Sequence, residues 1–299
     1  MLLILLVAGL SLGAAGLAVG IGRAAAKAGE LVPKPEALAL GAVTNFFDTL
    51  GIGSFAPTIA WFRFRRMVPD RLMPLTMFIG YTIPAILQGI IFLILLGVRV
   101  DPVLLAGCVA AIVAGGYLGV PIASRAPVRL IQAVIGVALL VAALFYCLAN
   151  LGLMPAGGTA NSLPPLLAVV AVLANFLFGI LLSFGVGNYA PTLAMLSLMG
   201  MDPRLAFPIM AAGAGFSGVA AGVQCVRTVR LDWRVVLGLT IGAIPSVLIA
   251  AFIVKEMPLT TLRWLVVVVV TYAGLTLLYS ALRKPSLVPP DAAEAAVTH

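Results

Sequence analysis

Nine long apolar segments follow one another along the chain, and this pattern limits it to the architecture of an integral membrane protein. They cover residues 1–20, 37–62, 71–98, 102–124, 130–150, 164–196, 205–226, 235–254 and 260–282. A helix of roughly 20 apolar residues crosses the hydrocarbon core of a bilayer. Only 9% of the 299 residues are charged, whereas soluble domains have about 25%. We therefore predict an all-α, polytopic membrane protein.

The two ends of the chain differ from the segments between them. The first ten residues, MLLILLVAGL, have no basic residue before the apolar run, and this run is long for a signal peptide. We therefore expect residues 1–22 to form a retained N-terminal transmembrane helix. The tail, residues 285–299, is rich in Pro and Ala, which predicts a disordered cytoplasmic segment.

A nine-residue motif occurs twice, as LGIGSFAPT at 50–58 and FGVGNYAPT at 184–192. Five of the nine positions are identical, and the offset is 134 residues. Without a gap, the same offset pairs Met67 with Met201, Pro69 with Pro203 and Pro74 with Pro208. An internal duplication explains these matches. It predicts one repeat over 37–150 and a second over 164–282, preceded by the extra N-terminal helix.

Each copy of the motif interrupts an apolar segment. Glycine weakens a helix and proline lacks the N–H that continues it, although proline suits a first helical turn. We expect a helix over 37–50, a break over 51–56 and a short helix from about Pro57, with the second break over 185–190. Ser54 and Asn188 are candidates for the N-cap positions. One continuous helix with a close-packing glycine face is the alternative.

The 18 Lys and Arg residues favour the broken helices. If every segment crosses the membrane once, these residues divide nine to nine between the two faces. If 37–62 and 164–196 are hairpins that return to the face they enter, the division is 14 to 4, and the positive-inside rule prefers it. The four outside residues are then Arg99, Arg204, Lys255 and Arg263. The cytoplasmic face carries Arg23, Lys27, Lys34, Arg63, Arg65, Arg66, Arg71, Arg125, Arg129, Arg227, Arg230, Arg234, Arg283 and Lys284.

This topology predicts a multi-pass protein of the cell inner membrane, with its N-terminus outside and its C-terminus in the cytoplasm. Each repeat contributes one hairpin and three spanning helices, which is an odd number of crossings. The second repeat is therefore expected to be inverted relative to the first. Broken helices within an inverted repeat are typical of secondary transporters.

The second half of each broken helix is expected to start near the membrane midplane. Its first N–H groups have no intrahelical partner, and its dipole is positive there. Two such ends facing each other predict an anion site without a buried Lys or Arg. The candidate substrate-binding residues are Asn45, Thr49, Gly51, Gly53, Ser54, Thr58, Ser183, Gly185, Gly187, Asn188, Tyr189 and Thr192. For Thr58 and Thr192, a hydrogen bond back to a carbonyl of their own helix is the alternative.

Asp48 is the only acidic residue deep inside an apolar segment, and its repeat partner is Leu182. Carboxylates within a membrane are candidates for function. Asp48 is therefore a candidate for coupling proton movement to anion movement. The alternative is that Asp48 hydrogen-bonds the turn of the hairpin.

Residues for other chemistry are scarce. The single histidine is His299, which excludes His-based triads and HExxH metal sites. The cysteines, Cys108, Cys147 and Cys225, lie in apolar surroundings without CxxC spacing and are expected to be buried small hydrophobes. We therefore expect no metal, no cofactor and no catalytic residue. Nucleic acid is not an expected partner, because the basic residues occupy short loops.

The two glycine-rich motifs, each at an apolar segment followed by three more helices, resemble the TauE/SafE family of sulfite exporters, also called the 4-toluene sulfonate uptake permease family. The family usually shows a longer glycine run after G-x-G, where this chain has Ser54-Phe55 and Asn188-Tyr189. The resemblance implies transport of sulfite or an organosulfonate such as sulfoacetate, without ATP and linked to the proton-motive force. An anion channel-like permease and an intramembrane enzyme are the alternatives. A bundle of this size can enclose a cavity alone or pair as a homodimer.

Overall fold

The computed structural model describes residues 2–50, 53–69, 72–95, 99–123, 128–152, 158–182, 188–228 and 230–282. These residues form helices and connecting loops, with one isolated bridge between Ala160 and Met201 and no sheet. The elements are α1 (Leu2–Ala28), α2 (Pro35–Thr49), α3 (Phe55–Arg65), α4 (Met73–Leu95), α5 (Pro102–Ala123), α6 (Val128–Asn150), α7 (Pro165–Leu182), α8 (Tyr189–Leu198), the 3-10 helix η2 (Pro203–Leu205), α9 (Ala206–Thr228), α10 (Trp233–Glu256) and α11 (Leu259–Leu282).

Six helices are long and apolar enough to cross a membrane, among the residues that the structure describes. The corresponding stretches are Leu2–Ala28, Leu75–Leu95, Pro102–Gly119, Pro165–Leu182, Trp233–Glu256 and Arg263–Leu282. The prediction of an all-helical, multi-pass membrane protein is therefore confirmed.

The first predicted helix break is present, whereas most of the second falls on residues 183–187, outside the described residues. α2 ends at Thr49 and α3 begins at Phe55, whereas α7 ends at Leu182 and α8 begins at Tyr189. The first short helix thus starts two residues before Pro57, where we predicted its start. The proline is still tolerated there, because the N–H that it lacks would have no acceptor within the first turn.

α1 continues beyond the predicted boundary at residue 22, through Arg23 and Lys27 to Ala28. The prediction followed hydrophobicity, which falls at Arg23. Alanine is the strongest helix former, and Ala25 is fully buried, so the helix continues past the apolar run. It ends before Gly29, whose φ of 71° suits glycine.

The ends of each broken helix lie together. Arg65, the last residue of α3, donates from Nε to Glu36 Oε1 in the first turn of α2 at 2.6 Å. After α8, the Asp202 amide donates to the Ala160 carbonyl, just before α7, at 3.0 Å. Each broken helix therefore forms a hairpin that returns to the end of the bundle where it starts.

The two hairpins start at opposite ends of α10. Lys34, just before α2, forms a 2.6 Å salt bridge with Asp232, which caps the start of α10. At the other end of α10, the guanidinium of Arg204, which follows α8, donates to the Met257 carbonyl. The loops with Lys34 and Arg204 thus lie at opposite ends of α10. Which end faces the cytoplasm stays a prediction.

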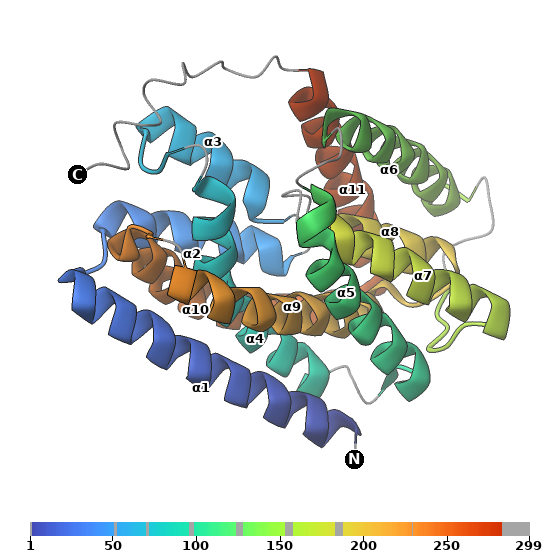
Figure 1. Ribbon diagram of the computed structural model, residues 1–299. Coiled ribbons are helices and arrows are strands. Elements are labelled where there is room, and N and C mark those ends of the chain that lie inside the picture. The colour runs from blue at the N-terminus through green and yellow to red at the C-terminus, as the bar shows by residue number, and fades with distance from the viewer. Residues whose placement is uncertain are drawn as a thin grey trace.

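Helix packing has an internal symmetry. α10 packs against α2 and α4, and α5 packs in the same way against α7 and α9. In addition, α4 packs against α9, and α6 packs against α11. Exchanging α2–α6 with α7–α11 leaves this set of pairs unchanged. α1 stands outside the set and lies along one side of the bundle, against α4, α9 and α10 (Figure 1).

Glycines allow the closest of these helix contacts. A Cβ added to Gly242 of α10 would lie 2.0 Å from the Leu38 carbonyl oxygen of α2. A Cβ added to Gly115 of α5 would lie 2.0 Å from the Phe176 carbonyl oxygen of α7. Small residues let helix backbones approach closely in membrane proteins, so equivalent helix pairs in the two halves are joined in the same manner.

Replacing Gly242 with alanine is expected to destabilise the protein, because the new methyl group would push α2 away from α10. The expected cost is about 1–3 kcal/mol, the usual range for overpacking. The measurement is the thermal unfolding midpoint in detergent. Gly16→Ala in α1 is the matched control, since nothing lies within 4 Å of a Cβ added there. Equal midpoints for the two variants would contradict this account of the helix contact.

Candidate functional site

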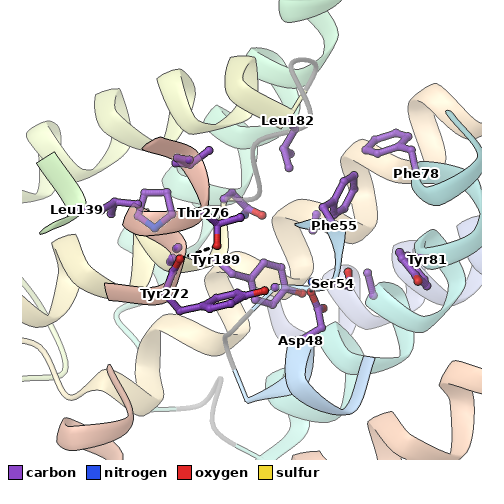
Figure 2. Close-up of a pocket in the computed structure, with 18 of the residues that line it drawn as sticks. Asp48, Ser54, Phe55, Phe78, Tyr81, Leu139, Leu182, Tyr189, Tyr272 and Thr276 are labelled. Atoms are coloured by element: carbon purple, nitrogen blue, oxygen red, sulfur yellow. Dashed lines mark hydrogen bonds between the residues drawn. The ribbon is translucent and has the colours of Figure 1, made fainter. Parts of the chain in front are cut away.

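The two helix breaks border one pocket. Gly53 and Ser54 from the first break and Asn188 and Tyr189 from the second all line it. Figure 2 shows Ser54, Asp48 and Tyr189 close together, with Tyr272 extending toward them from α11. Residues 134 positions apart in the sequence, such as Ser54 and Asn188, thus line one pocket.

The walls of the pocket are mostly apolar and aromatic. They come from four further helices, and no Lys or Arg is among the described lining residues. α4 contributes Phe78, Tyr81, Thr82 and Ala85, α6 contributes Leu139, α9 contributes Ala214, and α11 contributes Tyr272, Ala273, Thr276 and Leu277. The polar groups available to a ligand are therefore backbone amides, hydroxyls, one side-chain amide and the Asp48 carboxylate.

Asp48 connects the two halves of the first broken helix. Its Oδ1 accepts a hydrogen bond from the Ser54 amide at 2.7 Å, and the residue is 8% exposed. The interpretation that Asp48 hydrogen-bonds the hairpin turn is confirmed. The carboxylate lies at the N-terminal end of α3, where the helix dipole favours a negative charge.

Tyr81 joins three helices beside this break. Its hydroxyl lies 2.9 Å from Thr44 Oγ1 on α2 and 2.7 Å from Thr58 Oγ1 on α3. Thr58 Oγ1 also donates to the Ser54 carbonyl at 2.7 Å, which confirms the back-bonding alternative for Thr58. Tyr81 thereby fixes the short helix α3 against α2 and α4.

The second break is held by different contacts. Asn188 occupies the N-cap position of α8, but its side chain makes no capping hydrogen bond. Instead, Asn188 Nδ2 donates to the Met210 carbonyl of α9 at 3.3 Å. The Tyr189 hydroxyl donates to Gln88 Oε1 of α4 at 2.5 Å. This short helix is therefore fixed by side chains that contact α4 and α9.

Several predicted site residues lie beside the pocket and do not line it. Asn45 and Thr49 bond to carbonyls of their own helix, at 3.3 and 2.8 Å, which satisfies these polar groups without a ligand. Thr192 Oγ1 donates to Asn175 Oδ1 at 3.1 Å, so the back-bonding alternative does not hold for Thr192. Four other predicted residues, Gly51, Ser183, Gly185 and Gly187, lie outside the described residues.

The structure adds Tyr272 and Thr276 of α11 to the predicted residues. Thr276 Oγ1 donates to the Tyr272 carbonyl at 2.7 Å (Figure 2), and both residues line the pocket. The sequence held a signal for them: two polar residues four positions apart, and so on one helix face, in an apolar segment.

The cysteines agree in part with their prediction. Cys108 is a buried free thiol, whereas Cys147 is free and partly exposed. The side chain of Cys225 lies outside the described residues. Among the described residues, no group of three or more His, Cys, Asp or Glu side chains is placed to hold a metal ion.

Comparison with known proteins gives one match. No curated protein and no solved structure matches the chain significantly. The match is to a family model and covers most of the second predicted repeat, including the second glycine motif and α8. Residues 166–298 of this multi-pass membrane protein match the family model described as sulfite exporter TauE/SafE.

Proposed function

We propose that the protein is a secondary transporter for a small sulfur-containing anion, sulfite or an organosulfonate such as sulfoacetate. The anion binds near the membrane midplane at the N-terminal ends of α3 and α8. The observation that carries this proposal is that both helix breaks line one pocket. The TauE/SafE match over residues 166–298 supports the sulfur oxyanion as the substrate class.

Backbone amides supply most of the binding. The N–H groups of Tyr189 and Ala190, at the first two positions of α8, have no carbonyl four residues earlier in the helix to bond to. The Phe55 amide is at the first position of α3 and likewise has no acceptor within its own helix. An oxyanion accepts such hydrogen bonds, and the helix dipole adds a favourable charge interaction.

The two halves of the chain form an inverted repeat in this proposal. Two observations support it: the hairpins start at opposite ends of α10, and the helix pairs exchange when α2–α6 and α7–α11 are exchanged. A site at the interface of two such repeats is reached alternately from each side when one repeat rocks against the other. Transport then needs no ATP, and gradients drive it.

Asp48 couples the anion to a proton. Its ionised carboxylate occupies the donor at the start of α3 that a bound anion would otherwise use, and the two negative charges repel each other. Protonation of Asp48 removes the repulsion, so an anion and a proton bind together and cross together.

Two other functions remain as alternatives. An anion channel-like permease would give flux that rises without saturation and has no fixed ratio to protons. An intramembrane enzyme would need an activated nucleophile, and Ser54 has Asp48 bonded at its backbone amide and no His base in the described chain. The pocket between two helix breaks favours the transporter.

The first prediction is saturable uptake of labelled sulfite or a labelled sulfonate by liposomes that contain the purified protein. Uptake should respond to a pH gradient and should be absent from empty liposomes. The measurement is the initial rate against anion concentration under gradients of either sign. Without any saturable anion flux under these gradients, the transporter proposal fails; flux that rises linearly at every concentration would support the channel.

The second prediction concerns Asp48→Asn and uses a sulfonate whose charge does not change with pH. In the wild-type protein, uptake should rise as the pH falls, because protonation of Asp48 removes the competing charge. The variant should transport at a rate that is independent of pH. Asp101→Asn is the control: Asp101 caps α5, asparagine caps equally well, and the wild-type profile should persist. A wild-type pH profile in Asp48→Asn would contradict the coupling role.

A further inference from the structure

The side-chain amide of Asn188 has a fixed orientation. Its Nδ2 donates to the Met210 carbonyl at 3.3 Å. A backbone carbonyl can only accept a hydrogen bond, so exchanging the two amide atoms would place oxygen against oxygen. The Met210 contact therefore determines which atom of Asn188 is left for other partners: the acceptor, Oδ1.

This acceptor is buried without a partner. Asn188 is 1% exposed, and its Oδ1 has no hydrogen-bond partner among the described residues. Asn188 also lines the pocket between the helix breaks. Buried polar atoms are nearly always hydrogen-bonded, and an unmade bond is costly. The unpaired oxygen therefore points to a hydrogen-bond donor that the pocket receives from elsewhere.

Helix capping, the usual role of an asparagine at an N-cap position, does not explain why Asn188 Oδ1 is unpaired. An asparagine at an N-cap accepts from the N–H of the second or third helical residue. The third residue of α8 is Pro191, which has no N–H, and the side chain makes no capping bond at all. The start of α8 thus has N–H groups without an acceptor in their own helix and, on the adjacent residue, a side-chain acceptor without a partner among the described residues.

We propose that Asn188 determines specificity: its Oδ1 accepts a hydrogen bond from the bound anion, so the site prefers anions that carry their own O–H or N–H donor. Hydrogen sulfite and hydroxyalkanesulfonates belong to this class, whereas simple alkanesulfonates have acceptors only. This inference rests on the proposed transport of sulfur oxyanions and specifies which of them the pocket selects.

The first motif does not offer the same recognition. Ser54 occupies the position equivalent to Asn188, and its hydroxyl can donate as well as accept. Its amide is already bonded to Asp48. An uncharged, obligate acceptor is therefore placed at the second break, and a ligand is oriented with its donor toward α8.

The test compares 2-hydroxyethanesulfonate with ethanesulfonate as inhibitors of labelled sulfite uptake into liposomes. The two anions share one head group and differ by one hydroxyl. In the wild-type protein, the hydroxylated anion should inhibit at about tenfold lower concentration, the size of effect that pairing a buried acceptor gives. In Asn188→Ala and in Asn188→Ser, the ratio should fall toward one.

Asn161→Ala is the control, because Asn161 lies in the exposed loop before α7 and should keep the wild-type ratio. Equal inhibition by the two anions in the wild-type protein would overturn the inference. This result is expected if a water molecule always donates a hydrogen bond to Oδ1. Saturable sulfite uptake in the same experiment would still support the transporter. A wild-type ratio in Asn188→Ala would overturn the inference as well. If no saturable sulfite uptake occurs, the proposed function itself fails and the inference with it.

Discussion

Unwound backbone inside a bilayer must find polar partners, and the two helix breaks impose this requirement on the whole structure. Hydrocarbon offers no hydrogen bonds, so non-helical backbone is tolerated only where protein or a polar cavity covers it. At the first break, the Asp48 carboxylate accepts a hydrogen bond from the Ser54 amide. At the second, side chains of the short helix bond to α4 and α9. Both breaks face the same pocket, where the remaining amides meet a ligand in our proposal.

The surrounding helices hold these two breaks in place. The closed ends of the hairpins are joined by Glu36 with Arg65 and by Ala160 with Asp202. Tyr81 connects α2, α3 and α4 beside the first break. Glycines bring α10 against α2 and α5 against α7 with backbones nearly in contact. A site made of backbone donors needs such rigid support, because the backbone carries the binding groups.

Much of the architecture could be predicted from the sequence because glycine, proline and charge carry strong physical signals. The repeated motif located where α3 and α8 begin, since glycine weakens a helix and proline suits a first helical turn. The charge pattern favours hairpins that return to the face they enter, and this membrane topology stays a prediction. The glycine and proline signal depends only on neighbouring residues, and the charge signal is a sum over loops, so neither requires knowing how the helices pack.

The side chains that line the pocket were harder to predict. Thr49 and Thr58 have the right chemistry, but their hydroxyls bond to carbonyls of nearby helical backbone. Tyr272 reaches the pocket from α11, which packs against α6 and α8. Which face of an apolar helix turns inward depends on helix contacts far apart in the sequence, and an almost uniformly apolar segment carries little periodicity to indicate it.

In the proposed transporter, one anion lies between the two helix breaks. An experimental structure of the protein in lipid with sulfite or a sulfonate bound tests this claim directly. Density for the anion is expected between Ser54 and Asn188, within hydrogen-bond distance of the first amides of α8. Ligand density at another place, with the pocket between the breaks filled by side chains or water, would contradict it.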